Sequence, residues 1–325
     1  MVIAALNYLV KHLIKYIMIL SIDFRTDIPA FYSEWLINRF NEGYVYFRNP
    51  AYPQTIHKII LDKRHIEGIM WCSKDYLPIL HDLKNITDKF PSIFHYTITG
   101  YGKDIEPNVP SLDQSIYTFK ELSQRYGKEK VIWRFDPIFY CKDFGETETL
   151  RRFENICKEL HNYTDRVVVN FVSPYEKVKR HLPEMVTMQP LMKKILLLNM
   201  YGICHKYNFK LQTCGNGLQF KDLQGIEVTG CLDEHALNLI GIYPKPKNKA
   251  TEWGCLCYPN TCIGEYNTCL HKCKYCYASA DFDKCDENFK RHDPKSPLLI
   301  GWPRGDEQII EMKPKLLNTK QLKLF

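Results

Sequence analysis

Three cysteines near the C-terminal end of the chain have a spacing that suits a metal cofactor. Cys269, Cys273 and Cys276 form the pattern CxxxCxxC within the stretch TCLHKCKYCYA. Thiolates are soft ligands that suit zinc or iron–sulfur clusters. Structural zinc sites usually combine two CxxC pairs, whereas this chain has one. Three thiolates on one tight loop can each hold one iron of a 4Fe–4S cube and leave the fourth iron open, so we expect a 4Fe–4S cluster rather than zinc.

The same spacing resembles the signature of radical S-adenosylmethionine (radical SAM) enzymes, in which an aromatic residue precedes the last cysteine. Tyr275 fills that position. In that superfamily the open iron binds S-adenosylmethionine, and an electron from the cluster cleaves it to a 5′-deoxyadenosyl radical. The resemblance implies S-adenosylmethionine and an electron donor as partners, and it puts the Tyr275 ring beside the adenine. In that superfamily the motif normally follows the first barrel strand, whereas here it follows the last predicted strand.

Other cysteines leave two interpretations open. Cys255 and Cys257 form the sequence CLC, and Cys231 ends the last predicted strand. These residues either pack their loops as small apolar side chains or form a second metal site. We expect His271, inside the motif loop, to be a loop residue rather than a ligand. The scattered cysteines are expected to belong to the core; they are Cys72, Cys141, Cys157, Cys204 and Cys214.

The elements that must position these residues alternate between strands and helices. The predicted strands are Met18–Phe24, Tyr44–Arg48, Gly68–Trp71, Phe94–Thr99, Val131–Phe135, Val167–Phe171, Phe209–Thr213 and Ile226–Thr229. The predicted helices are Ala30–Asn41, Asp75–Lys89, Leu112–Tyr126, Glu148–His161, Gln189–Tyr207 and Glu234–Leu239. Alternation of this kind predicts an α/β fold with a parallel sheet. Eight such units fit a closed, TIM-like (β/α)₈ barrel, and an open doubly wound sheet is the alternative.

Polar residues follow several of the predicted strands directly. In a barrel such residues lie at the C-terminal face, where active sites are built. We therefore predict that a group of charged side chains lines the barrel mouth and orients cofactor or substrate. Polar residues that simply mark where strands stop are the alternative. The predicted catalytic residues are Arg25, Asp27, Lys74, Arg134 and Asp136.

The sequence pattern divides the chain into three parts. Residues 1–17 form an N-terminal extension, 18–243 the barrel, and 244–325 a cysteine-rich iron–sulfur module with a C-terminal tail, which we expect to pack over the C-terminal face of the strands. The apolar segment Val2–Leu20 contains lysines, which are costly in lipid, so we expect no integral membrane span. A surface-bound membrane helix, or a translation start at Met18, remains open.

Compartment and partners follow from charge and cysteine usage. The segment Val2–Leu20 lacks the features of a signal peptide, so we expect a reducing, cytoplasmic location. In such a location disulfides among the thirteen cysteines are not expected, and the clustered cysteines more often bind metal. The net charge of +7 and 21 tyrosines support an alternative function. That alternative is a nucleic-acid-binding protein with a structural zinc or iron–sulfur site and no radical chemistry.

Several segments resemble an uncharacterised family called domain of unknown function eighteen-forty-eight. They are RTDIPAFYSEW (25–35), EGYVYFRNP (42–50), TGYGKDIEPNVP (99–110), VIWRFDPI (131–138), GEYNTCLHKCKYCYA (264–278) and HDPKSPLLIG (292–301). The family's C-terminal cysteine cluster is similar to that of radical SAM enzymes, with a distant likeness to spore photoproduct lyase and DNA-repair photolyase. The resemblance implies that Cys269, Cys273 and Cys276 bind the cluster, and that Cys255 and Cys257 match the family's CxC pair. We therefore expect a radical SAM-type enzyme of unknown substrate, with nucleic-acid repair or modification as one class of reaction.

Overall fold

The computed structural model describes residues 18–313 except for residue 23, 50–51, 143 and 245–253. The predicted N-terminal extension, residues 1–17, lies outside the described residues. Within those residues, no helix has the combined length and apolar character that crossing a bilayer demands. All thirteen cysteines are described, and none forms a disulfide.

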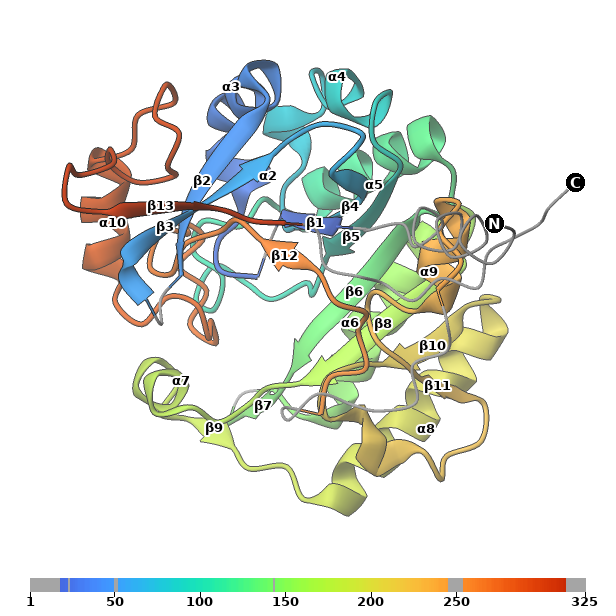
Figure 1. Ribbon diagram of the computed structural model, residues 1–325. Coiled ribbons are helices and arrows are strands. Elements are labelled where there is room, and N and C mark those ends of the chain that lie inside the picture. The colour runs from blue at the N-terminus through green and yellow to red at the C-terminus, as the bar shows by residue number, and fades with distance from the viewer. Residues whose placement is uncertain (1–17, 23, 50–51, 143, 245–253, 314–325) are drawn as a thin grey trace, which may run out of the picture.

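An eight-stranded parallel sheet forms the centre of the molecule (Figure 1). Its strand order is β11-β10-β8-β6-β5-β4-β1-β12. The strands are β1 (Met18–Ile22), β4 (Ile66–Ser73), β5 (Ser92–Thr97), β6 (Val131–Ile138), β8 (Arg166–Phe171), β10 (Lys210–Thr213), β11 (Ile226–Val228) and β12 (Thr261–Cys262). Within this sheet each strand from β1 to β11 pairs with the next one along the chain, and β12 lies on the free side of β1. This is the order that strands take in an α/β barrel.

The two ends of this sheet approach each other through loops. Among the described residues no strand pairing joins β11 to β12. The segments beside them still meet, because the Tyr258 N–H donates to the Leu232 carbonyl at 2.9 Å. The Cys231 N–H also donates to the Cys257 sulfur at 3.1 Å. The predicted α/β fold with a parallel sheet is therefore confirmed, whereas full closure into a barrel stays a prediction.

One predicted barrel strand was assigned to the wrong sheet. Tyr44–Arg48 is a strand, but β2 (Tyr44–Asn49) pairs antiparallel with β3 (Tyr52–Ile60) in a three-stranded sheet that β13 (Gln308–Glu311) completes. Most of β2 is only half-buried, whereas β1 and β5 are buried throughout. Half-buried strands suit a sheet with one solvent face, and parallel strands of a central sheet are covered on both faces. The eighth strand of the central sheet is instead β12, from the region assigned to the cysteine-rich module.

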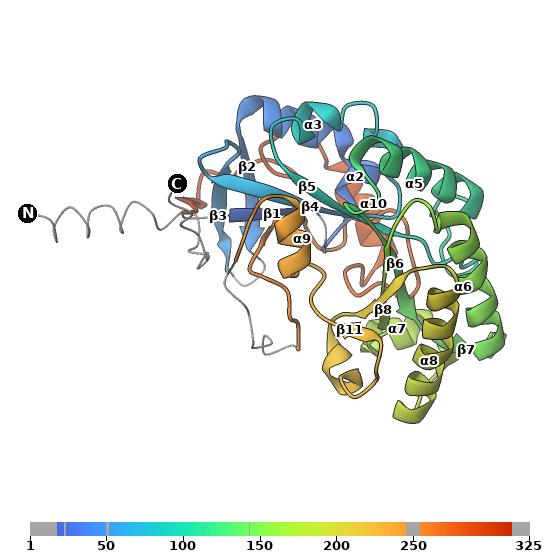
Figure 2. The same ribbon diagram turned by 90° about the vertical axis from the view of Figure 1, so that its right-hand side faces the viewer.

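Helices cover the outer face of the central sheet, as Figure 2 shows for α5, α6 and α8. The helices are α2 (Ile28–Phe31), α3 (Ser33–Glu42), α4 (Lys84–Thr87), α5 (Leu112–Tyr126), α6 (Glu146–Leu160), α7 (Glu176–His181), α8 (Pro190–Lys206), α9 (Glu234–Leu239) and α10 (Phe282–Lys290), with 3₁₀ turns η1 (Leu77–Ile79) and η2 (Asn216–Phe220). A short ribbon, β7 (Tyr140–Cys141) with β9 (Met185–Val186), lies apart from the large sheet. Side chains cap several helices: Ser111 begins α5 and Asp233 begins α9, each accepting a backbone N–H of the first turn.

The two faces of the central sheet bury different sets of residues. Val167 and Val169 of β8 belong to the large core beneath the helices, whereas Val168 belongs to a smaller core on the opposite face. Alternation of side chains along a strand explains this division. The smaller core also contains Cys214 and Cys231, which follow β10 and β11. The sheet thus brings scattered cysteines together in the smaller core, to which α9 contributes Ala236 and Leu237.

We expect Gly230→Ala to weaken the junction between the two ends of the central sheet. A Cβ atom at Gly230 would lie 2.4 Å from the backbone nitrogen of Cys257, and neither backbone segment can move aside cheaply. Overpacking of this kind costs about 1–3 kcal/mol of unfolding free energy, which urea unfolding measures. The control is Gly202→Ala on α8, where nothing lies within 4 Å of the new Cβ and the helix should gain about 0.5–1 kcal/mol. Equal stability for both variants would contradict the predicted close contact.

Candidate active site

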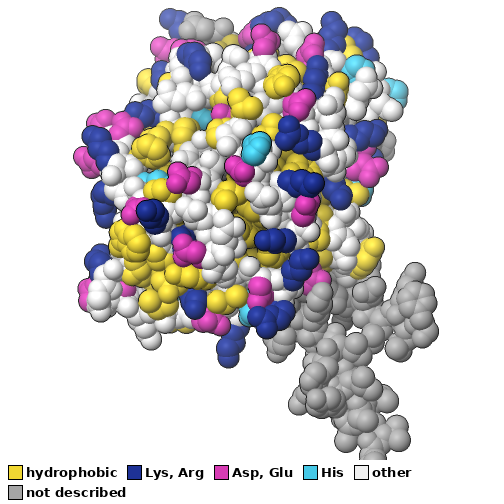
Figure 3. Space-filling model, turned by 90° about the horizontal axis from the view of Figure 1, so that it is seen from above, with side chains coloured by type: hydrophobic (Ala, Val, Ile, Leu, Met, Phe, Trp, Pro, Cys, Tyr) yellow, Lys and Arg dark blue, Asp and Glu magenta, His cyan; other side chains and the backbone are white. Residues whose placement is uncertain are grey.

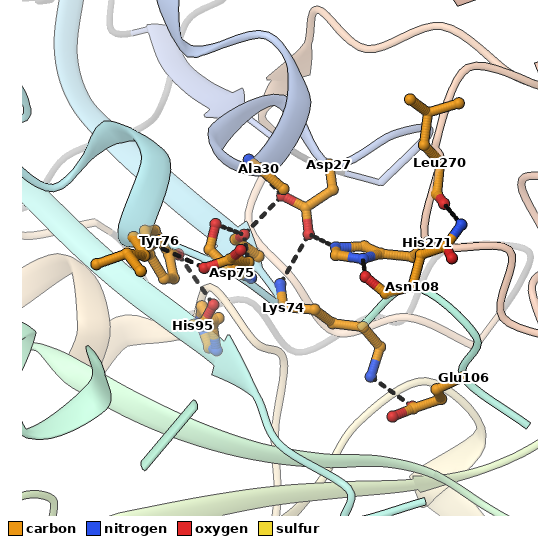
Figure 4. Close-up of polar contacts among 12 residues, drawn as sticks. Asp27, Ala30, Lys74, Asp75, Tyr76, His95, Glu106, Asn108, Leu270 and His271 are labelled. Carbon is orange, nitrogen blue, oxygen red and sulfur yellow. Dashed lines mark hydrogen bonds and ion pairs between the residues drawn. The ribbon is translucent and has the colours of Figure 1, made fainter. Parts of the chain in front are cut away.

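The loop that carries CxxxCxxC lies against residues at the carboxyl ends of β1 and β4. Asp27 follows β1 and Lys74 follows β4, as the sequence predicted. The Asp27 carboxylate is 6% exposed and joins these segments to the loop (Figure 4). Its Oδ1 accepts from the Ala30 N–H at 3.2 Å and the Ser73 hydroxyl at 2.6 Å. Its Oδ2 accepts from the Lys74 N–H at 2.8 Å and lies 2.9 Å from His271 Nε2.

His271 is a buried anchor of the cysteine loop. Its side chain is 3% exposed, and its ring lies edge-on to Phe31 with 4.6 Å between centroids. On the other side, the loop after β5 holds the same segment: Asn108 Nδ2 donates to the Leu270 carbonyl at 2.7 Å, and the Asn108 N–H donates to the His271 carbonyl at 3.2 Å. The sequence placed His271 in a loop, which is correct, but gave no sign that it pairs with Asp27.

A second buried contact holds the loop through Glu106. This carboxylate is 3% exposed and accepts from Lys74 Nζ at 2.8 Å, Thr99 Oγ1 at 2.8 Å and the Tyr275 hydroxyl. The Lys74 ammonium also lies 5.6 Å from the centroid of the Tyr275 ring. Burial lowers the pKa of Lys74, but Glu106 and Cys273 outweigh that effect and raise its pKa above the ordinary value, so the ammonium stays charged.

Tyr275, predicted to lie beside an adenine ring, is surrounded by protein in this structure. The residue is 7% exposed, and its ring packs near those of Tyr101 and Phe139, with centroids 5.8 and 5.7 Å away. Its hydroxyl donates to Glu106. These contacts give Tyr275 a part in fixing the loop, and its role toward a cofactor stays a prediction.

The three motif cysteines lie close enough to influence one another. Burial raises the pKa of Cys269, and Asp27, Cys276 and Cys273 raise it further. Burial also raises the pKa of Cys273, which Lys74 opposes. One buried thiol, Cys273, and two half-buried thiols, Cys269 and Cys276, therefore lie where several negative charges are unfavourable without a cation. A metal cluster is the cation that a set of thiolates suits best. Among the described residues, no three His, Cys, Asp or Glu side chains are grouped as a ready metal-ion site.

Apolar residues surround this part of the loop. Cys273 and Tyr275 share a buried cluster with Ile105, Val109 and Phe139. Cys276 packs against the same cluster at its edge. An apolar surrounding of this kind limits access of water and lowers the local dielectric constant around a metal centre. The donor set and its surroundings therefore fit a thiolate-bound cluster.

The remaining predicted charged residues lie in two other places. Arg134 contacts Asp136 and donates to the Cys231 sulfur at 2.7 Å. The Asp136 carboxylate helps to raise the pKa of Lys74, after the larger effects of Glu106 and Cys273. Arg25 is not part of that group: it donates to the Gly264 carbonyl at 3.3 Å, and its guanidinium carbon lies 5.5 Å from the centroid of the Tyr266 ring.

The other predicted metal ligands form a second group of thiols. The Cys257 N–H donates to the Cys255 sulfur at 3.4 Å, and Cys257 in turn accepts from the Cys231 N–H. Cys214, which the sequence assigned to the core, is buried but also lies beside Cys231 and 3.6 Å from Arg134 Nη2. Sequence reasoning missed Cys214, because only the order of strands brings the ends of β10 and β11 together.

Glu106 and Asn108 were also missed. Both lie within TGYGKDIEPNVP, a segment already noted for its family resemblance, in the loop between β5 and α5. A glutamate in a long loop has no periodic signal that tells which neighbour it faces. The nearby polar strand end did carry a signal, and this is why Lys74 was predicted.

A surface cavity of about 630 Å³ lies at the opposite, amino-terminal end of the strands. It is lined by the first residues of β8 and β10, Arg166 and Lys210, together with Asp165, His205 and His235. Active sites of parallel α/β sheets form at the carboxyl ends of the strands. The cavity is therefore separate from the candidate active site.

Comparisons with known proteins bear on the family but little on the fold. A search of curated proteins finds no match. Among solved structures, the crystal structure of orotidine 5′-monophosphate decarboxylase from Methanocaldococcus jannaschii, complexed with the inhibitor BMP, is similar at 10% identity, covering 84% of this chain and 96% of that chain. Its TM-score of 0.24 is too low to support any conclusion. The family described as "Domain of unknown function (DUF1848)" matches residues 19–278, so the chain belongs to this family.

Proposed function

We propose that this protein is an iron–sulfur enzyme of the radical SAM type, in which Cys269, Cys273 and Cys276 hold a 4Fe–4S cluster. One observation carries the proposal: the CxxxCxxC loop is fastened at the carboxyl ends of the strands through His271 to Asp27. This buried contact fixes the loop at the carboxyl ends of the parallel strands, where the active sites of α/β barrels form.

The residues of the chain have distinct tasks in this proposal. When bound, the cluster and S-adenosylmethionine supply reductive cleavage of the sulfonium and hydrogen abstraction from a substrate. Asp27 and Glu106 hold the cysteine loop in position through His271 and Tyr275. The Lys74 ammonium, which favours the thiolate form of Cys273, offsets part of the negative charge of the thiolates. Arg134 and Asp136 are the charged groups available to orient the cofactor or the substrate.

The test is anaerobic reconstitution of the full chain with iron and sulfide, followed by dithionite and S-adenosylmethionine. We expect equal amounts of iron and sulfide, absorbance near 400 nm and formation of 5′-deoxyadenosine. The triple variant Cys269→Ala/Cys273→Ala/Cys276→Ala should lose the product entirely. The matched control is Cys141→Ala, a cysteine beside the same apolar cluster but outside the motif, which should retain it.

Two outcomes would overturn the proposal. One is a fully loaded iron–sulfur cluster that yields no 5′-deoxyadenosine, which excludes the radical SAM reaction. The other is zinc in place of iron, which supports the alternative of a nucleic-acid-binding protein with a structural metal. On the face drawn in Figure 3, lysine and arginine side chains are interspersed with aspartate and glutamate.

A further inference from the structure

Four thiols outside the CxxxCxxC loop form a continuous chain of contacts. The Cys231 sulfur lies in side-chain contact with those of Cys214 and Cys257, and the Cys257 sulfur lies in contact with that of Cys255. Cys214, Cys231 and Cys257 are at most 9% exposed, and Cys255 is half-buried. All four belong to the smaller core or pack against it, and they come from three separate segments of the chain.

The four cysteines lie on both sides of the opening in the central sheet. Cys214 follows β10, Cys231 follows β11, and the pair Cys255 and Cys257 precedes β12. These are the segments on the two sides of the opening between β11 and β12. A metal ion bound by all four sulfurs would link the two ends of the sheet, where the described residues provide few backbone hydrogen bonds.

We propose that Cys214, Cys231, Cys255 and Cys257 form a second metal site, which binds a soft metal through four thiolates and joins the ends of the central sheet. Four thiolates are the ligand set of structural zinc and of iron–sulfur clusters. Binding replaces the thiol protons, which are released to solvent. In this structure the four sulfurs contact one another in a row, from Cys214 to Cys255. The cysteine side chains must therefore rotate about χ1 to place all four sulfurs around one metal.

The surroundings suit the negative charge of such a centre. Arg134 Nη1 donates to the Cys231 sulfur at 2.7 Å, and its Nη2 lies 3.6 Å from the Cys214 sulfur. Two backbone N–H groups, those of Cys231 and Cys257, already point at cysteine sulfurs. Hydrogen bonds and a fixed cation around thiolates are the features that stabilise metal–thiolate sites from outside the ligand shell.

His95 is a further buried polar side chain in contact with the segment that carries Cys231. Its Nε2 lies 3.0 Å from the Cys231 carbonyl and must donate to it, so Nδ1 carries a lone pair. His95 is 1% exposed, and among the described residues Nδ1 has no hydrogen-bond partner.

The test uses the full chain in which the first site has been removed by Cys269→Ala/Cys273→Ala/Cys276→Ala. We expect this variant to bind about one equivalent of Zn²⁺, or of Co²⁺ with thiolate charge-transfer absorbance, and to melt at a higher temperature with metal than without it. Anaerobic iron and sulfide reconstitution of the same variant distinguishes an iron–sulfur cluster from zinc. Neither measurement depends on radical chemistry, so failure of the proposed enzyme function would leave this result intact.

Further variants assign the ligands. Adding Cys231→Ala/Cys257→Ala should abolish metal binding, and the milder Cys255→Ser should weaken it at least tenfold. The matched control adds Cys157→Ala/Cys204→Ala, a contacting pair of fully buried thiols between α6 and α8, and should bind metal unchanged. A folded first-site variant that binds no metal overturns the proposal, as does metal binding that survives both Cys231→Ala/Cys257→Ala and Cys255→Ser.

Discussion

Replacing Asp27 by asparagine should lower the free energy of unfolding by about 3 kcal/mol and reduce iron loading of the cysteine loop. Both oxygens of the carboxylate accept hydrogen bonds, from Ala30 and Ser73 on one side and from Lys74 and His271 on the other. An amide accepts on one side only, so its NH₂ group must face donors. A buried donor left without an acceptor accounts for this cost.

Urea unfolding measures the first effect, and iron content after reconstitution measures the second. Hydrogen exchange of the backbone around His271 should rise, because the carboxylate that holds this segment is gone. The control is Asp75→Asn in the neighbouring loop, where the carboxylate accepts from the Leu77 N–H. Burial and Asp27 raise the pKa of Asp75, so a neutral amide should be tolerated there at a cost below about 1 kcal/mol. Equal losses in the two variants would show that Asp27 does not anchor the loop.

The central strands could be predicted from the sequence because their apolar, β-branched residues lie next to one another in the chain. β8, with three consecutive valines buried on both faces, reads as a parallel strand wherever it lies in the chain. β2 has the same strand propensity, but its partner depends on a tertiary contact that propensity does not encode. β12 spans only Thr261 and Cys262, which is too short for any periodicity to appear. Its place beside β1 therefore emerges only in three dimensions.

The residues of the candidate site also divide into those that the sequence could predict and those that it could not. Asp27 and Lys74 were predictable, because polar residues directly after parallel strands meet at one edge of the sheet. Glu106 was not predictable, because its position depends on how a long loop folds back over that edge. The sequence predicted His271 as a loop residue and Cys214 as a core residue, since a lone histidine or cysteine gives no indication of its partner. Contacts between loops, rather than between strands, decide which charged groups meet.

The buried pair of Lys74 and Glu106 gives the second large effect. Lys74→Met removes the ammonium 2.8 Å from Glu106 and leaves a carboxylate that is 3% exposed with only neutral partners, Thr99 and Tyr275. Breaking a buried ion pair from one side costs about 3–5 kcal/mol of unfolding free energy. Because Lys74 also favours the thiolate of Cys273, iron loading of the loop should fall as well.

The double variant Lys74→Met/Glu106→Gln separates charge burial from packing. With both charges gone, the glutamine can still accept from Thr99 and Tyr275, so most of the lost stability should return, and the two single costs should exceed the double cost by at least about 2 kcal/mol. The exposed pair Lys120 and Glu159, with a similar distance of 2.7 Å, is the matched control and should couple by less than about 1 kcal/mol. If the two pairs couple equally, water reaches Lys74 and Glu106. The loop then closes over a wet site, and the low-dielectric surroundings inferred for its three cysteines do not exist.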